Sequence, residues 1–329
     1  MDPSVPDAPA VPRPAPASPH DDGPDPLPGH RHPHPPGDPS GLPRIAVVGA
    51  GRVGLALAIA IDRAGWPVTA VATRDPGRAA ELRARVPSAA ERHLAALPDA
   101  ADLILVTVPD DAIAEVASRV RLYAGQGIAH TSGALPAEVL APARGAGAAL
   151  ASFHPLVPFA ETDRAVASLR GATVALEGDP PLVALLADVA TALGAQPVRL
   201  PPGGKAAYHA AAVLAAGGFI ALLDAIAEVA RGAGLDEPGA LAIYAPLIRA
   251  GLANAEAGGI AGALTGPFVR GDAGTVRDHL AALDRLAPGA RDLYRAAARR
   301  EIALARARGD LSAERAAALA ALLVQHGAA

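Results

Sequence analysis

The sequence predicts two domains of different class: a doubly wound parallel α/β sheet over residues 44–201 and an all-helical domain over residues 202–329. In the first range, short apolar runs alternate with segments of helical periodicity, which is typical of a parallel sheet built from β–α–β units. Beyond Gly204, the periodic segments all have helical spacing and break at Gly or Pro. We therefore expect an α/β fold followed by a helical domain.

Residues 1–43 precede both domains and differ from them in composition. They hold 15 of the 33 prolines and almost no aliphatic side chains. Such a segment cannot bury enough apolar surface to offset the entropy lost on ordering. We predict that it is a disordered, Pro-rich tail.

Charge and composition exclude several classes of function. The tail carries a charge of −4 and the remainder is neutral, with few aromatic residues and no basic stripe, so a nucleic-acid partner is not expected. The chain has no cysteine, which excludes a thiol nucleophile, disulfides and cysteine-ligated metals; no metal site is predicted. We recognise no charge-free apolar stretch of about 18 residues and no secretory signal, and therefore predict a cytoplasmic protein with no membrane partner.

The individual elements follow from the same periodicities. Strands are predicted at 44–50, 67–73, 102–108, 127–133, 171–178 and 196–201, and helices between them at 51–65, 75–86, 110–122 and 181–194. In the second domain, helices are predicted at 205–233, 237–256, 273–286, 288–308 and 311–325.

The run GAGRVG directly follows the first predicted strand and opens the first helix. Gly49 permits a tight turn, Gly51 lets the backbone approach a pyrophosphate, and Gly54 allows close packing of helix on strand. The free N–H groups of the helix N-terminus then face the phosphates. This context predicts a Rossmann dinucleotide site formed by Gly49, Ala50, Gly51, Arg52, Val53 and Gly54.

The end of the second strand selects between the two dinucleotides. In NAD sites an acidic residue there binds the ribose 2′-hydroxyl. Here Thr73 and Arg74 occupy that place, and a hydroxyl beside a guanidinium suits a 2′-phosphate. NADP(H) is therefore favoured over NAD(H). Asp75 is the alternative, as the ribose acid or simply as the cap of the next helix.

The segment after the strand at 102–108 reaches the edge where such sheets bind ligands. Thr107, Val108 and Pro109 are expected to line the nicotinamide ribose, although an ordinary strand-to-helix turn would look the same.

Several polar residues at the same edge are candidates for chemistry. Lys205, the only lysine in the chain, opens the first helix of the second domain, and His209 lies one turn later on the same face. His154 is followed by Pro155, which restricts it to an extended backbone and so orients its ring. We predict Lys205, His154 and His209 as acid/base residues, against the alternatives of a solvated lysine and a packed histidine.

A carboxylate site is expected beside them. Thr131 and Ser132 offer hydroxyl groups, and Gly133 leaves a backbone N–H accessible, although a hydroxyl-capped turn is equally consistent with the sequence. Further along, Arg270 could hold a carboxylate with two hydrogen bonds, or pair with Asp272 instead.

The chain resembles a family in which a Rossmann-like domain is joined to a C-terminal domain of unknown function, related to the 6-phosphogluconate and β-hydroxyacid dehydrogenases. The resemblance covers most of residues 44–290 and rests on GAGRVG, TVPDDAI, HTSGAL, SFHPLVPF, KAAYHAAAVLAAG and ALTGPFVRGDAGTVRDHL. Some members are similar to an alternative ketopantoate reductase, which implies NADPH-dependent reduction of a small 2-oxo acid. Related prephenate dehydrogenases have a similar His-Pro whose histidine contacts the substrate hydroxyl.

The resemblance also implies an assembly and shows one departure. In related enzymes the helical domains of two subunits intertwine, which implies a homodimer in which the loop of Arg270 reaches the partner's site. Family members usually carry an asparagine about three helical turns after the lysine, where this chain has Gly217 and Gly218.

Two functions are therefore consistent with the sequence. The first is an NADP(H)-dependent oxidoreductase that acts on a CH–OH group and reduces a small 2-oxo acid, with ketopantoate as the best single substrate. The alternative is a non-catalytic dinucleotide-binding sensor or scaffold, which the missing asparagine favours.

Overall fold

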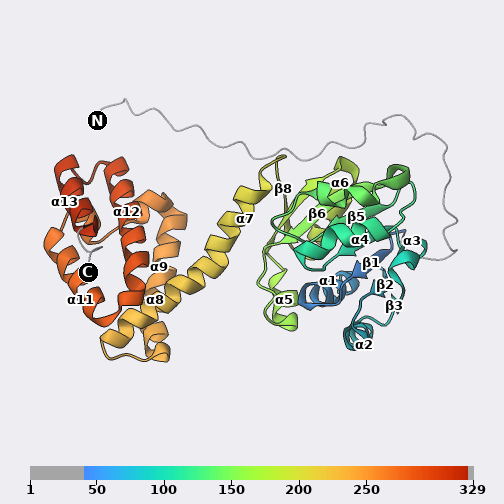
Figure 1. Cartoon of the computed structure of the whole chain (residues 1–329), viewed down its shortest axis with the longest axis horizontal. Helices are drawn as coiled ribbons and strands as arrows, with labels where there is room; N and C mark the ends of the chain where they lie inside the picture. Colours follow the sequence, from blue (N-terminus) through green and yellow to red (C-terminus); the bar gives the residue numbers. More distant parts are fainter. Residues whose placement is uncertain (1–40, 325–329) are drawn as a thin grey trace, which may run out of the picture.

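The structure is a computed structural model that describes residues 41–324. The prediction of a disordered tail thus falls almost entirely on residues outside the described part. Figure 1 shows a sheet domain and a helical domain joined by one long helix that spans the gap between them. This confirms the predicted combination of an α/β fold with a helical C-terminal region.

One eight-stranded sheet, of order β3-β2-β1-β4-β5-β6-β7-β8, forms the centre of the first domain in the described residues. Its strands are β1 (Ile45–Val48), β2 (Val68–Ala72), β3 (Ala90–Glu91), β4 (Leu103–Val106), β5 (Gly127–His130), β6 (Ala149–Pro155), β7 (Thr173–Gly178) and β8 (Gln196–Arg199). All neighbours pair in parallel except β6 and β7, which are antiparallel. The sheet is therefore mostly parallel, as predicted, with one reversed junction.

Helices cover both faces of this sheet (Figure 1). They are α1 (Arg52–Arg63), α2 (Pro76–Arg85), α3 (Leu97–Ala100), α4 (Ile113–Arg119), α5 (Thr162–Ser168), α6 (Pro180–Ala192) and the 3₁₀ helices η2 (Asp110–Ala112) and η3 (Ala137–Ala143). The predicted helix 110–122 is thus a 3₁₀ turn followed by α4, and it ends at Arg119. The helices α3, α5 and η3 were not predicted.

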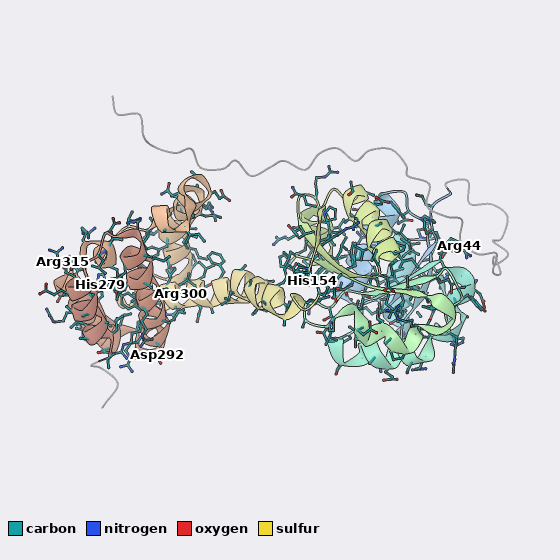
Figure 2. The ribbon with its side chains drawn as sticks, turned by 90° about the horizontal axis from the view of Figure 1, so that it is seen from above. Arg44, His154, His279, Asp292, Arg300 and Arg315 are labelled. Atoms are coloured by element: carbon teal, nitrogen blue, oxygen red, sulfur yellow. The ribbon has the colours of Figure 1, made fainter. Side chains whose placement is uncertain are left out.

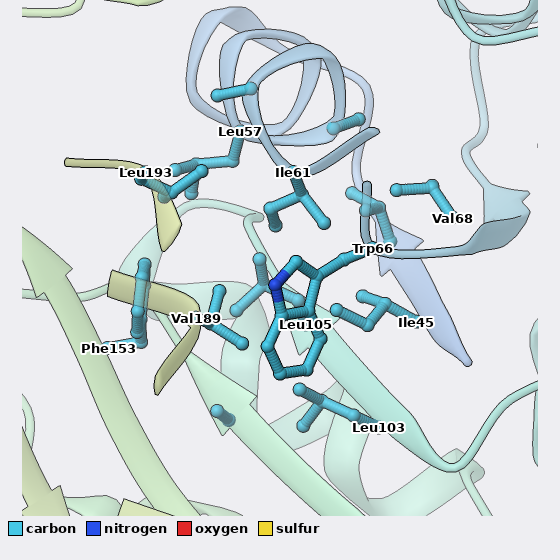
Figure 3. Packing of buried hydrophobic residues seen from close by; sticks show 14 of the residues in the cluster. Ile45, Leu57, Ile61, Trp66, Val68, Leu103, Leu105, Phe153, Val189 and Leu193 are labelled. Carbon is cyan, nitrogen blue, oxygen red and sulfur yellow. The ribbon is translucent and has the colours of Figure 1, made fainter. Parts of the chain in front are cut away.

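Two apolar layers hold the helices onto the sheet. On one face, α1 and α6 pack over alternate residues of the central strands. Figure 3 shows the Trp66 ring in this layer beside Ile45, Leu103 and Leu105. Burying each such side chain contributes roughly 1.5–3 kcal/mol, so the layer fixes the register of the strands. The opposite face packs against α4 and η3.

The second domain consists of helices throughout its described part. They are α7 (Lys205–Val213), the π-helical segment η5 (Leu214–Gly218), α8 (Phe219–Gly232), α9 (Glu237–Ala263), α10 (Pro267–Arg270), α11 (Ala273–Leu286), α12 (Arg291–Arg308) and α13 (Ala313–Val324). Helices α10 to α13 enclose a small apolar core. Gly217 and Gly218, where the family resemblance led us to look for an asparagine, lie in η5 inside the long helix.

The long helix exposes most of its apolar surface. Lys205–Gly232 is the one helix among the described residues that is long and apolar enough to cross a membrane, and only 6% of its most apolar window is buried. Our expectation that no such charge-free stretch exists is therefore wrong, because residues 206–223 contain no Asp, Glu, Lys or Arg. Tyr and His within that stretch made it look more polar than it is.

Candidate active site

A cleft of about 970 Å³ opens at the C-terminal ends of β1, β2 and β4. This is the edge of a doubly wound sheet at which ligands bind. Eight of the predicted cofactor residues line it: Gly49, Ala50, Gly51, Thr73, Arg74, Thr107, Val108 and Pro109. The other three, Arg52, Val53 and Gly54, form the first turn of α1 behind the loop.

The three glycines of this loop have different surroundings. Gly49 has φ +95°, a backbone conformation that residues other than glycine rarely adopt. A Cβ on Gly54 would overlap the carbonyl oxygen of Gly49 and the Thr107 hydroxyl, whereas a Cβ on Gly51 would meet nothing within 4 Å. The backbone at Gly51 is therefore open to a ligand, and Gly54 is fixed by packing.

Thr107 connects the glycine loop to β4. Its Oγ1 lies 2.7 Å from the carbonyl oxygen of Gly49 and 3.0 Å from that of Val48, so its one hydroxyl proton is shared between these two acceptors. The side chain is 8% exposed. Thr107 therefore holds the loop in shape from beneath the cleft.

The far end of the cleft is rich in arginine. Asp75 caps α2: its Oδ1 accepts hydrogen bonds from the backbone N–H groups of Gly77 and Arg78 at 2.9 and 3.1 Å. Arg74 and Arg92 both line the cleft, and neither guanidinium forms an ion pair with any residue in 41–324. Arg92, which follows the two-residue strand β3, was not among the sequence candidates.

A second polar cluster lies at the ends of β5 and β6. The long helix Lys205–Gly232, which we call the linker helix, begins there. Lys205 Nζ donates to Ser152 Oγ, and the two residues are only 4% and 1% exposed. Ser152 was missed in the sequence because it is one serine in an apolar run. Figure 2 shows His154 at the same junction of sheet domain and linker helix.

His154 lies against the first turns of α7. Its ring packs edge-on to Tyr208, with centroids 5.8 Å apart, and to His209, at 5.7 Å. A Cβ on Gly133 would overlap ring atoms of both histidines. The structure thus brings together four predicted residues: His154, His209, Gly133 and, beside them, Lys205.

Three polar atoms in this cluster are buried without a hydrogen-bond partner among the described residues: His154 Nδ1, Tyr208 OH and His209 Nδ1. Buried polar atoms in folded proteins are nearly always paired. These three atoms are therefore the polar groups of the cluster that no residue in 41–324 satisfies.

The predicted hydroxyl groups are used differently. Ser132 Oγ donates to Asp110 Oδ2 at 2.8 Å and accepts from the backbone N–H groups of Ala134 and Leu135. Thr131 Oγ1 makes only a long contact of 3.4 Å with the carbonyl oxygen of Val106. Ser132 therefore stabilises the turn. The Thr131 hydroxyl, with only one long contact inside the chain, is the one that could bind a substrate group.

Asp110 joins the two sites. It directly follows Pro109, which lines the cleft, and its carboxylate accepts from Ser132 in the polar cluster. The segment Thr107–Asp110 therefore passes from the glycine loop to the cluster around Lys205.

The ionisation of the cluster follows from its burial. Burial lowers the pKa of Lys205 to about 8, although the carboxylates of Glu177 and Asp110 oppose the shift. Burial also lowers the pKa of His154 to about 4, with the Lys205 charge as the second cause. At neutral pH, Lys205 is thus charged and His154 is neutral.

Arg270 is not part of this cluster within one chain. It lies in α10, in the helical domain, which Figure 1 places at the other end of the linker helix. No ion pair joins Arg270 to Asp272 in the described residues; Asp272 instead caps α11 by accepting from Thr275.

Comparison with known proteins places both halves of the sequence. Residues 38–155 match the Rossmann-like domain family, and residues 172–301 match a domain of unknown function, DUF2520. The chain is a Rossmann-like protein with a DUF2520 domain. The second match begins before β7, so it includes the last two strands of the sheet.

Solved structures with the fold of this Rossmann-like DUF2520 protein come from several organisms. A Bacteroides fragilis protein assigned as an NADP oxidoreductase has 24% identity and a TM-score of 0.64, over 79% of this chain and 98% of that one. A Thermotoga maritima protein has 24% identity and a TM-score of 0.62, over 80% and 99%. A reductive aminase from Aspergillus terreus, in complex with NADPH, has 17% identity and a TM-score of 0.55, over 86% and 92%. No protein with a curated description matches the sequence.

Proposed function

We propose that this protein is an NADP(H)-dependent oxidoreductase that reduces a small carbonyl compound, with a 2-oxo acid as the substrate class and ketopantoate as the first candidate. The observation that carries the proposal is the continuity of the two sites through Asp110. A dinucleotide in the cleft would place its nicotinamide end near Pro109, next to the buried cluster of Lys205, His154 and His209.

The residues of the cleft fit the cofactor. Gly49, Gly51 and the first turn of α1 would hold the pyrophosphate, because the Gly51 backbone is open and the N-terminus of α1 faces the cleft. Arg74 and Arg92 would hold the 2′-phosphate that distinguishes NADP(H) from NAD(H). When bound, the reduced nicotinamide supplies the hydride.

The chain's own residues would supply the proton and the orientation. Lys205, charged and buried, donates the proton to the substrate oxygen as negative charge develops there. His154 and His209 are expected to orient the substrate through their unpaired Nδ1 atoms. The carboxylate would bind at Thr131 and the backbone of Gly133, with Ser132 supporting the turn.

A homodimer would complete the site. The linker helix and α9 expose large apolar side chains, among them Leu214 (72%), Leu247 (67%) and Ile260 (74%). Contiguous apolar surface of this kind marks a contact between proteins. In a homodimer joined along this surface, Arg270 of one subunit could reach the substrate carboxylate in the other. We assign the long apolar helix to this contact and place the protein in the cytoplasm.

The solved structures of similar fold favour one variation in substrate. They include a reductive aminase, an imine reductase from Pseudomonas sp. and a 1-pyrroline-5-carboxylate reductase from Streptococcus pyogenes. A substrate with C=N in place of C=O would use the same hydride and the same proton donor. The substrate panel should therefore hold both.

The experiment that tests the proposal is NADPH oxidation by the full chain with a panel of 2-oxo acids and cyclic imines. We expect turnover with at least one of them, and loss of at least about 100-fold in turnover for Lys205→Ala at unchanged NADPH affinity. Tight NADPH binding with no turnover on any substrate would instead favour the non-catalytic sensor or scaffold. Parent-rate turnover by Lys205→Ala would remove Lys205 from the proton-donor role.

The cofactor preference has its own test. Arg74→Ala and Arg92→Ala should weaken NADPH binding by about tenfold or more each and leave NADH binding nearly unchanged, because only NADPH carries the 2′-phosphate. Fluorescence titration with both cofactors measures this. Equal losses for the two cofactors would contradict the assignment of the 2′-phosphate.

A further inference from the structure

We propose that Ser152 and Glu177 are positioning residues that fix the Lys205 ammonium group for proton transfer; this rests on the proposed function, in which Lys205 is the donor. The starting point is the register of the sheet. His130 of β5 pairs with Ser152 of β6, and Ser152 pairs with Glu177 of β7. Register partners on neighbouring strands direct their side chains to the same face. The three residues therefore form a polar row across three strands.

The first member of this row, His130, has both ring nitrogens in hydrogen bonds to the backbone. The backbone N–H of Ser132 donates to His130 Nδ1 at 3.1 Å, so Nδ1 carries no proton. His130 Nε2 must then carry the proton and donate to the carbonyl oxygen of Pro136 at 3.1 Å. Burial, with the Lys205 charge as the second cause, lowers the pKa of His130 to about 4. A neutral, fully bonded His130 forms a wall beside Lys205 rather than a proton partner.

Of the other two members, Ser152 contacts Lys205 directly, and Glu177 lies beside Ser152 on the next strand, from which its charge favours the protonated form of Lys205. Ser152 Oγ accepts from Lys205 Nζ, and both side chains are buried. Glu177 Oε2 accepts from the backbone N–H of Ala137 at 3.3 Å, which attaches the carboxylate to η3 and leaves Oε1 without a hydrogen-bond partner among the described residues. The row thus offers Lys205 one hydrogen-bond acceptor and one negative charge.

Ser152 and Glu177 supply what a buried ammonium group needs, a hydrogen-bond acceptor and a nearby negative charge. A buried ammonium group without a nearby negative charge would lose its proton, because burial disfavours the charged form. The groups that face Lys205 are Glu177 from β7 and Asp110 from η2, which favour the charged form, and the neutral rings of His130 from β5 and His154 from β6.

Ser152 and Glu177 therefore have separate tasks. One N–H of the Lys205 ammonium binds Ser152, which fixes the direction of the other two. Glu177 keeps the ammonium protonated until a substrate takes one proton from Nζ, and water returns that proton afterwards. Neither residue needs to touch the substrate.

The chain offers a direct test because Lys205 is its only lysine. Full-length protein labelled with [ε-¹⁵N]lysine gives one side-chain ¹⁵N resonance, whose pH titration reports the Lys205 pKa without any assay of activity. We expect a midpoint near pH 8 in the parent protein. Glu177→Gln removes the negative charge and Ser152→Ala removes the acceptor, so both midpoints should move to lower pH.

The control is Glu138→Gln. It removes the same charge from a side chain on η3 that is 71% exposed and pairs with Arg144. Its midpoint should match that of the parent. If Glu177→Gln does not fold, Glu177→Asp retains the carboxylate one methylene further away, and its midpoint should fall below that of the parent by a smaller shift.

The outcomes separate this proposal from the proposed function. Unchanged midpoints in folded Glu177→Gln, or Glu177→Asp in its place, and Ser152→Ala would overturn the positioning roles, whether or not the protein oxidises NADPH. Midpoints that shift as expected in a protein that turns over no substrate would support the arrangement around Lys205 and reject the oxidoreductase. In an active enzyme, the fall of kcat at high pH should move to lower pH in step with the ¹⁵N midpoint.

Discussion

Gly51, at the N-cap of α1, and Gly54, in its first turn, lie three residues apart, yet the space around each is different. Gly51 has no heavy atom within 4 Å of a Cβ, and Gly54 has the Gly49 carbonyl and the Thr107 hydroxyl in the way. The glycine motif is therefore kept for two physical reasons, access at one position and packing at the other.

Matched alanine variants separate these reasons. Gly54→Ala should lower the free energy of unfolding by about 1–3 kcal/mol, because the added methyl group displaces packed backbone. Gly51→Ala should leave the unfolding free energy nearly unchanged and weaken NADPH binding by about tenfold or more. Urea denaturation and fluorescence titration measure the two effects. Equal destabilisation by both variants would show that Gly51 is also a packing position.

A second prediction concerns His130 and acid. Its pKa is about 4 in the folded chain, below the ordinary value of 6.5, so the unfolded chain binds more protons between these two values. The free energy of unfolding should therefore fall as the pH drops from 6.5 towards 4, by about 3 kcal/mol from this residue. His130→Asn removes that contribution; His154, shifted in the same direction, retains its own.

Denaturant titrations of the parent protein and His130→Asn at several pH values test this. A pH dependence that is the same in the two proteins would mean that His130 has the same pKa in the folded and the unfolded chain.

The candidate site could be predicted only where its residues lie in one short motif. Gly49, Thr73 and Lys205 stand out in the sequence because a turn, a strand end or a unique residue type marks them. Ser152 and Glu177 are 25 positions apart, and only the antiparallel pairing of β6 and β7 brings them together. Their role depends on strand register, which no local pattern specifies.

At the scale of elements, the glycine loop depends on β4 for its shape. The acceptors of the Thr107 hydroxyl are the carbonyl oxygens of Val48, on β1, and of Gly49, in the loop that follows it. The segment that passes from the cleft to the polar cluster therefore also supports the floor of the cleft.

Thr107→Val keeps the shape of the side chain and removes the hydroxyl donor. It should cost about 1–2 kcal/mol of unfolding free energy, because the Gly49 carbonyl oxygen loses this donor, whereas the Val48 carbonyl oxygen still accepts from the backbone N–H of residue 107. NADPH binding should weaken as well, because the loop is less well held. Thr131→Val is the matched control, since its hydroxyl makes only a 3.4 Å contact. A stability loss of equal size in the control would argue against a special role for Thr107.

The strands that the sequence predicted are those with an uninterrupted apolar pattern or a clear break at each end, including several of only four residues. Sequence reasoning missed β3, which has only two residues, and β6, in which Ser152 and His154 interrupt the apolar pattern. Ser152 and His154 are the polar residues of β6 that belong to the candidate site. The same two residues break the apolar pattern by which the strand could have been predicted. The antiparallel direction of β7 was also missed, because periodicity gives the length of a strand but not its direction.

At the scale of the whole molecule, the single chain leaves a long apolar surface uncovered. Figure 2 shows the linker helix passing between the two domains with few neighbours. We expect a second subunit to cover it.

Charge placed on this surface tests the dimer. Leu214→Glu and Ile260→Glu alter side chains that are 72% and 74% exposed in the single chain, so neither should destabilise the fold. Light scattering should give a dimer for the parent protein and a monomer, with reduced turnover, for each variant. Val198→Glu, at an exposed position of the terminal strand β8, should remain dimeric. A monomeric parent would contradict the assembly.

The most direct test of the central claim follows the hydride itself. NADPH deuterated at C4 is prepared separately as each of its two stereoisomers. Each is incubated with the full chain and the substrates of the panel, and the masses of the products are measured by mass spectrometry. We expect one stereoisomer to transfer a single deuterium to the former carbonyl or imine carbon of at least one substrate. Transfer of no deuterium from either stereoisomer, by a protein that binds NADPH tightly, would contradict this expectation.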